Sequence, residues 1–103
     1  MAQVFKALGD PVRLRLFHLL ALKDELCVCH LTEALSLPQS TVSRHLGVLR
    51  NAGLVETRRD GKWMHYRLAD DMASTLSAIV KEQSDEMHRI DAERLTVALK
   101  GCG

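Results

Sequence analysis

The sequence predicts a mainly α-helical fold with a small β-hairpin, arranged as a winged helix-turn-helix. Leucine dominates a composition that is 47% hydrophobic and only 4% aromatic, which favours helices over a β-sandwich. Two helical patterns are joined by the short turn Ser36-Leu37-Pro38, and a hairpin signal follows at Asp60-Gly61. The 103 residues fit one domain. We expect residues 1–99 to form it and residues 100–103 to be a mobile tail.

The first part of the chain predicts two helices separated by a glycine. Gln3–Leu8 forms a short helix that Gly9 ends. Asp10 then caps the free N–H groups of a second helix, and Pro11 suits its first helical position. This second helix is apolar nearly all round as far as Leu22, so we expect it to be the central buried helix.

The middle of the chain predicts the helix-turn-helix pair. The bracing helix runs from about Cys29 to Leu35, and the reading helix covers Gln39–Asn51. Val42, Leu46 and Leu49 repeat at the spacing of one buried helical face. In such a pair the second helix enters the major groove of DNA, so the opposite face of Gln39–Asn51 is expected to read bases.

A hairpin and a long helix complete the prediction. Leu54–Arg59 and Lys62–Leu68 are the expected strands. Helical periodicity returns from about Asp71 to Leu99. So long a helix exceeds what one small domain can cover. We therefore expect it to be a dimerisation helix whose apolar stripe packs against a second copy of the chain.

Charge is distributed unevenly although the net charge is only +1. Residues 39–68 carry six Lys or Arg against two Asp or Glu, whereas residues 70–94 carry three against seven. A basic middle beside an acidic helix favours a polyanionic partner on one face. Neither a signal peptide nor a membrane span is indicated, so we expect a cytoplasmic protein with no membrane partner.

The candidate DNA contacts are short hydrogen-bonding side chains and arginine on the reading helix, with basic residues on the hairpin. On the helix they are Gln39, Ser40, Thr41, Ser43, Arg44 and His45, and on the hairpin Arg58, Arg59 and Lys62. His45 adjoins core positions, so it either contacts DNA or packs with a local hydrogen bond. No Ser/His/Asp arrangement, phosphate loop or paired acids point to an enzyme, and no catalytic cofactor is expected. A protein-interaction module of the same fold is the remaining alternative.

Two cysteines are the most informative feature outside the reading helix. Cys27 and Cys29 stand beside the predicted helix N-terminus, which favours thiolates, and thiolates bind soft ions. Residues two apart in a regular helix point in nearly opposite directions. Both thiols can therefore hold one ion only if the first turn is distorted, which would disturb the reading helix beside it. Otherwise the pair is simply two small buried hydrophobic residues.

The sequence resembles the ArsR/SmtB metalloregulators, and more narrowly the arsenic-responsive ArsR repressors, whose metalloid box reads Glu-Leu-Cys-Val-Cys-Asp-Leu-Cys. The likeness rests on three strings: Cys27-Val28-Cys29-His30-Leu31, residues 43–54 beginning Ser-Arg-His-Leu-Gly, and Gly61-Lys62-Trp63-Met64-His65-Tyr66-Arg67-Leu68. It implies a homodimer, joined through its first and last helices, on a palindromic operator. It also implies release of DNA when trivalent arsenic or antimony binds the thiolates as an inducer.

The resemblance leaves the third metalloid ligand open. Cys27 and Cys29 match the first two ligands, but Thr32 stands where the box has its third cysteine, and His30 replaces Asp. Cys102 is either that third ligand, from its own or the partner chain, or a stray thiol. With two thiols only, a mono-substituted arsenical, or an ion that keeps a water or hydroxide ligand, fits better.

Three other sensors of the same fold stay possible at this point. A redox or sulfide sensor would use reversible thiol oxidation. Cadmium and lead sensors of the family also use Cys-x-Cys, but add cysteines from an N-terminal arm, and this chain has none before Cys27. A zinc site on the last helix, from Asp85, His88 and Asp91, is only faintly suggested.

Overall fold

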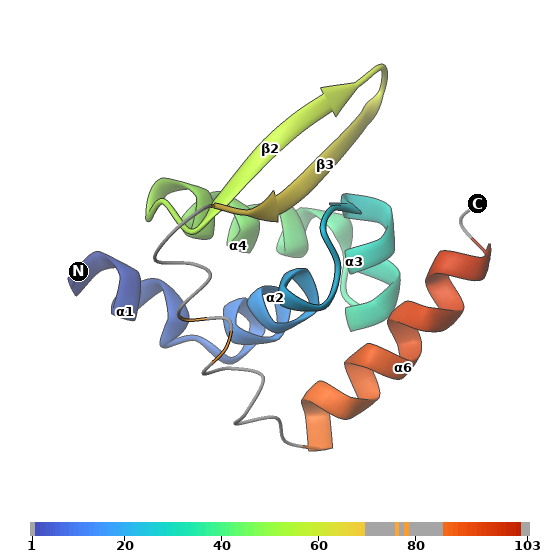
Figure 1. The fold of residues 1–103 in the computed structure, drawn as a ribbon, viewed down its shortest axis with the longest axis horizontal. Coiled ribbons are helices and arrows are strands. Elements are labelled where there is room, and N and C mark those ends of the chain that lie inside the picture. Colours follow the sequence, from blue (N-terminus) through green and yellow to red (C-terminus); the bar gives the residue numbers. More distant parts are fainter. Residues whose placement is uncertain (1, 70–75, 77, 79–85, 102–103) are drawn as a thin grey trace.

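The computed structural model describes residues 2–69, 76, 78 and 86–101 and has the predicted winged helix-turn-helix architecture (Figure 1). Its described elements, in chain order, are α1 (Ala2–Leu8), α2 (Pro11–Leu22), β1 (Leu26–Cys27), α3 (Val28–Leu35), α4 (Gln39–Asn51), β2 (Val55–Asp60), β3 (Trp63–Leu68) and α6 (Glu86–Gly101). No helix among these residues is long and apolar enough to cross a membrane.

Helix α2 is the centre of the core, as its apolar pattern predicts. Leu16, Phe17, Leu19 and Leu20 are each at most 1% exposed. The start of the helix is fixed by Asp10, whose Oδ2 accepts the N–H groups of Val12 at 2.9 Å and Arg13 at 3.1 Å. The capping prediction is therefore confirmed.

The helix-turn-helix pair follows from the local sequence. Ser36 ends α3 in a left-handed conformation (φ 55°), and Pro38 precedes the first turn of α4. On α4, Val42, Leu46 and Leu49 are each 0% exposed, which confirms the predicted apolar face. The bounds of this helix, Gln39–Asn51, are also those predicted from the sequence.

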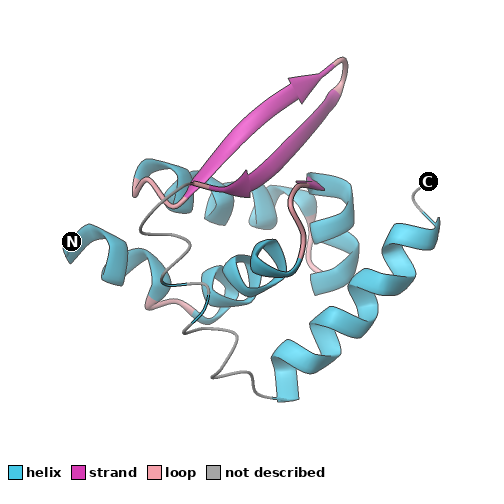
Figure 2. Ribbon diagram, in the orientation of Figure 1, coloured by secondary structure: helices cyan, strands magenta, loops and turns pink. Residues whose placement is uncertain are grey.

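The sheet has one strand more than the sequence predicts. Strands β2 and β3 form the expected antiparallel hairpin, and Gly61 occupies its turn with φ 62° (Figure 2). The two-residue strand β1 pairs with β3, placing Leu26 opposite Tyr66 and Cys27 opposite His65. A strand of two residues is too short to show the alternation of polar and apolar residues by which strands are predicted. This pairing attaches the start of α3 directly to the wing.

The described part of the last helix, α6, packs within its own chain. Leu95 and Ala98 are buried against α2 and α3, which corrects the expectation that the stripe containing Leu95 faces only a second copy. Leu95 packs there because the other elements of so small a domain leave the apolar sides of α2 and α3 uncovered. Residues 70–75, 77 and 79–85 of the predicted helix lie outside the described residues. The helix also continues through Gly101, so Lys100 and Gly101, predicted to lie in a mobile tail, are helical, and the other two residues of that predicted tail lie outside the described residues.

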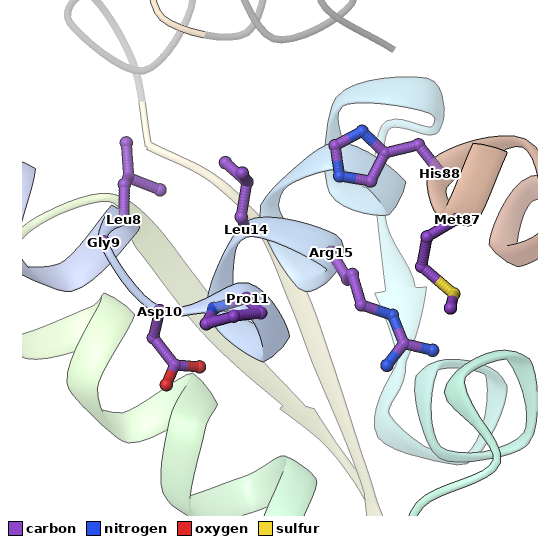
Figure 3. A pocket seen from close by; sticks show the side chains of 8 residues that line it. All are labelled: Leu8, Gly9, Asp10, Pro11, Leu14, Arg15, Met87 and His88. Carbon is purple, nitrogen blue, oxygen red and sulfur yellow. The ribbon is translucent and has the colours of Figure 1, made fainter. Parts of the chain in front are cut away.

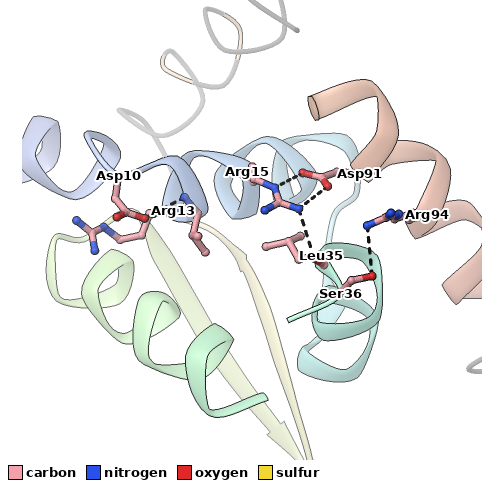
Figure 4. Close-up of polar contacts among 8 residues, drawn as sticks. Asp10, Arg13, Arg15, Leu35, Ser36, Asp91 and Arg94 are labelled. Atoms are coloured by element: carbon pink, nitrogen blue, oxygen red, sulfur yellow. Dashed lines mark hydrogen bonds and ion pairs between the residues drawn. The ribbon is translucent and has the colours of Figure 1, made fainter. Parts of the chain in front are cut away.

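A buried ion pair holds α6 in place (Figure 4). The guanidinium of Arg15 on α2 donates to both carboxylate oxygens of Asp91 at 2.8 and 2.9 Å, and to the carbonyl of Leu35 at 3.4 Å. Asp91 is completely buried. Farther along α6, Arg94 donates to the Ser36 hydroxyl at 3.3 Å. Helix α6 is therefore tied to α2 and to the end of α3 through named polar contacts.

Candidate nucleic-acid interface and thiol box

The exposed face of α4 carries the predicted reading residues. Gln39, Ser40 and Arg44 are exposed, while Thr41 and Ser43 are half-buried beside them. Pro38 provides no side-chain cap, so the first N–H groups of α4 keep their hydrogen-bonding capacity for an outside acceptor. A helix start with free N–H groups and a partial positive charge suits a backbone phosphate.

His45 is placed differently from the other five candidates on α4. Its side chain is only 13% exposed, and its Nδ1 lies 3.3 Å from the guanidinium of Arg13 and 3.9 Å from Asp10. Burial lowers the pKa of His45, and the neighbouring charges of Arg44 and Arg13 act in the same direction against the attraction of Asp10. Of the two sequence interpretations, these contacts favour packing: His45 fixes α4 against the connection between α1 and α2.

The three wing residues predicted to contact DNA divide into two kinds. Arg59 and Lys62 are exposed and form no ion pair with any described carboxylate, and Lys62 lies 5.4 Å from the centre of the Trp63 ring. Arg58, in contrast, donates to both oxygens of Glu25 at 2.6 and 3.1 Å. The wing therefore presents two uncompensated cations near its tip and one that is neutralised by the segment before β1.

The thiol box is built around a helix start, as its position in the sequence predicts. Cys27 is the N-cap of α3, and its Sγ accepts the N–H of Cys29 at 3.4 Å. His30 completes a reciprocal cap, since its Nδ1 accepts the N–H of Cys27 at 3.4 Å. Cys27 is buried at 4% exposure and Cys29 is half-buried.

This geometry changes the expected conflict between the two thiols. Cys27 has extended backbone angles (φ −73°, ψ 148°), so it stands outside the helix rather than in its first turn. The rule that residues two apart face opposite ways holds only inside a regular helix. Its Sγ already turns back over the first turn toward Cys29. The opposed directions expected for two residues inside a helix therefore do not apply to this pair.

The described residues do not complete a three-ligand site. No group of three His, Cys, Asp or Glu side chains among them is arranged to hold a metal ion. Thr32, which stands in the place of the third cysteine, has a buried hydroxyl oxygen without a hydrogen-bond partner in the described structure. Cys102, the remaining candidate, lies outside the described residues. The two thiols present fit a thiophilic ion, and the third position depends on a group beyond them.

The last-helix residues that faintly suggested zinc are used elsewhere where they are described. Asp91 is committed to Arg15, and the ring of His88 stacks on that of His18 with centroids 4.4 Å apart. His88 also borders a cavity of about 270 Å³ between the α1–α2 connection and α6 (Figure 3). Among the described residues that line this cavity, the one carboxylate is that of Asp10, which caps α2, so these residues offer a cation little. Asp85 lies outside the described residues.

The family assignment follows from comparison with known proteins. The pattern of the family described as "Bacterial regulatory protein, arsR family" matches residues 10–57. The "Arsenic resistance transcriptional regulator ArsR1" of Pseudomonas putida is 44% identical over 89% of this chain and 74% of its own length. The "Arsenical resistance operon repressor" of Escherichia coli is 40% identical over 95% of this chain and 80% of its own. The chain belongs to the ArsR family.

A solved structure agrees with this assignment. The homodimeric winged helix-turn-helix DNA-binding domain of Mb0332 from Mycobacterium bovis, described as a possible ArsR-family regulator, superposes with a TM-score of 0.73 at 38% identity. The match covers 82% of this chain and 78% of that one. This ArsR-family chain is accordingly a DNA-binding transcriptional repressor and not an enzyme. The family resemblance drawn from the Cys-Val-Cys box and the wing string is confirmed.

Proposed function

We propose that this repressor is a homodimer that leaves a palindromic operator when trivalent arsenic or antimony binds Cys27 and Cys29. The observation that carries the proposal is the double role of Cys27, which caps α3 through its sulfur and pairs with β3 through its backbone. A thiophilic ion that takes this sulfur acts at once on the helix that braces α4 and on the wing. Arsenic regulators at 40–44% identity support the choice of metalloid.

Cys102 of the same chain is the third ligand in this proposal. Helices α3 and α6 lie side by side and run in opposite directions, with Arg94 on α6 bonded to Ser36 at the end of α3 (Figure 1). Gly101 lies seven residues after Arg94, and Cys29 lies seven residues before Ser36. At 1.5 Å per residue both distances are about 10 Å along their helices. This register supports a third sulfur close to the level of Cys29.

The dimer in this proposal uses the outer faces of α1 and α6. Phe5 on α1 is 60% exposed, and Met87 and Val97 on α6 are 44% and 67% exposed. Apolar side chains that stay exposed on two terminal helices suit a second copy with the same surface. The domain would then comprise residues 1–99, with the last helix serving both its own core and the dimer.

The test is operator binding with and without sodium arsenite, in a phosphine reductant that offers no competing thiol. The DNA is a duplex selected in vitro by the protein itself. We expect arsenite to weaken binding of the parent by at least about fivefold. Cys27→Ser with Cys29→Ser should bind DNA without responding. Binding that is unaffected by arsenite in the parent contradicts the proposal.

Three further measurements separate the alternatives. Arsenic–sulfur coordination by X-ray absorption should show three sulfurs in the parent and two in Cys102→Ser; two in both would remove Cys102 from the site. Release by peroxide or persulfide, reversed by the reductant, would instead favour the redox sensor. Release by cadmium but not arsenite would favour the cadmium sensor.

A further inference from the structure

Glu25 contacts both strands of the wing from a position two residues before Cys27. Its carboxylate accepts two hydrogen bonds from Arg58 on β2, at 2.6 and 3.1 Å, and lies 3.8 Å from Nδ1 of His65 on β3. The strand register explains this meeting. Cys27 is opposite His65, His65 is opposite Arg58, and directly opposed residues share one face of a sheet. Glu25, two residues from Cys27, belongs to the same side.

The contact fixes the charge that the wing presents. The Arg58 guanidinium donates through two of its nitrogens to both oxygens of the Glu25 carboxylate, so the two groups form a bidentate ion pair. The charge of Arg58 is thereby compensated, whereas Arg59 beside it forms no ion pair with a described carboxylate. A cation that contacts a phosphate adds about 0.9 to the slope of log affinity against log salt. While Arg58 is paired with Glu25, it does not contribute such a phosphate contact.

The same contact joins the wing to the thiol box. Glu25 lies two residues before Cys27, whose sulfur caps α3, so only Leu26 stands between them. A reorientation of the Cys27 side chain can therefore shift Glu25, because the backbone between the two residues is too short to take up the movement. The exposed pair with Arg58 costs little free energy to break and can respond to such a change.

We propose that Glu25 is the positioning residue of the wing and that it passes ligand binding at Cys27 and Cys29 on to the DNA-binding surface. The proposal rests on the proposed function for its ligand and adds the route by which that ligand acts. Without ligand, Glu25 holds the hairpin against β1 in its DNA-binding orientation. Ligand binding turns Cys27, loosens the Glu25–Arg58 pair and lets the wing leave that orientation.

The experiment measures DNA affinity by fluorescence anisotropy across a range of salt, with and without sodium arsenite, in the parent and in Glu25→Gln. Without arsenite, Glu25→Gln should already bind DNA at least about fivefold more weakly than the parent, because the wing is no longer held in its DNA-binding orientation. The release factor, which is the DNA affinity without arsenite divided by the affinity with arsenite, should be at least about fivefold smaller in Glu25→Gln than in the parent. Arsenite binding itself, followed by ultraviolet absorption of the arsenic–thiolate bonds, should be unchanged.

Two further variants control this experiment. Arg59→Gln removes a neighbouring wing cation that has no described carboxylate partner, so without arsenite it should weaken DNA binding and make the salt slope shallower by about 0.9. Glu25→Arg combined with Arg58→Glu restores an ion pair and should recover much of the release factor, which a merely structural role of Glu25 would not predict. Both outcomes together support a link through this pair.

Two outcomes overturn the inference. A parental release factor in Glu25→Gln would show that the pair carries no coupling, and a parental DNA affinity without arsenite would show that Glu25 does not hold the wing. The failure of the proposed function looks different. If arsenite binds neither protein, the metalloid assignment and the route from it are wrong, while the DNA affinity without arsenite still decides whether Glu25 holds the wing.

Discussion

Two arginine–carboxylate pairs in this molecule have similar geometry and different surroundings. Arg15 and Asp91 join α2 to α6 at 2.8 and 2.9 Å, and Arg58 and Glu25 join the wing to the thiol box at 2.6 and 3.1 Å. The Asp91 side chain is 0% exposed, whereas those of Arg58 and Glu25 are 55% and 29% exposed. Water therefore competes for the second pair and not for the first. The buried pair holds the fold, and the exposed pair is free to regulate.

The largest effect should come from breaking the buried pair. Asp91→Ala leaves the Arg15 guanidinium largely buried without its carboxylate, which should lower the free energy of unfolding by about 3–5 kcal/mol. Urea denaturation at one fixed protein concentration measures this value. Arg15→Met combined with Asp91→Leu should recover much of the loss, because neither charge is then left unpaired. If Asp91→Ala lowered the free energy of unfolding by less than about 1 kcal/mol, the buried pair would contribute no more to stability than an exposed pair does.

The next effect tests an exposed charge that faces DNA rather than another residue. Arg44 is exposed on α4 and forms no ion pair with a described carboxylate. Arg44→Gln should weaken operator binding by about 1–3 kcal/mol if the side chain contacts a base edge, with no change in the urea midpoint. Anisotropy titrations on the selected duplex and on an unrelated duplex check this. Equal loss on both duplexes would make Arg44 a phosphate contact instead.

A smaller effect is expected at the start of α2, where Asp10 is partly exposed. Asp10→Ala removes an N-cap and should cost about 1 kcal/mol of stability. Burial acts to raise the pKa of Asp10, but the N–H and charge of Arg13 outweigh it, and the pKa falls below 3.8. The stabilisation is therefore complete well above pH 3.8 and is lost as the pH falls through the lowered pKa. Parent and variant stabilities should converge there, and a constant difference would contradict this.

The smallest effect on stability should come from the exposed pair itself. Glu25→Gln should leave the urea midpoint unchanged within error, since exposed ion pairs contribute little to folding. The same variant is expected to change the response to arsenite, so stability and regulation separate at this position. A large shift of the midpoint would mean that the wing contact belongs to the fold, and the contrast with Asp91 would disappear.

Local patterns were sufficient to predict the helices of the helix-turn-helix and the hairpin, though not β1, because each of these signals lies inside the element that it specifies. Asp10 and Pro11 mark a helix start, and the spacing of Val42, Leu46 and Leu49 marks a buried face. Cys27 and Cys29 were found in the same way, from their position before a helix. Each of these features can be predicted from residues that are close together in the sequence.

The contacts that join the elements could not be predicted in that way. Arg15 and Asp91 are 76 residues apart, and Arg58 and Glu25 are 33 residues apart. No periodicity or motif relates such positions in a single sequence. The role of His45 depended on the same kind of information, because Arg13 and Asp10 approach it only after α2 packs on α4. Glu25 was not predicted as a site residue, and its place two residues before Cys27 is the one local signal that could have drawn attention to it.

The sulfur cap of α3 has a consequence for the motions of the native protein. Helices usually start at Ser, Thr, Asp or Asn, whose oxygens accept N–H groups strongly, and here a thiol does this work at 3.4 Å. A weak acceptor leaves the first turn easy to open without unfolding the rest of the domain. Amide hydrogens at the start of α3 should therefore exchange with deuterium sooner than those in the middle of α4. The first turn of α3 is thus expected to be less stable than the rest of the helix, and the cysteines lie at this end of it.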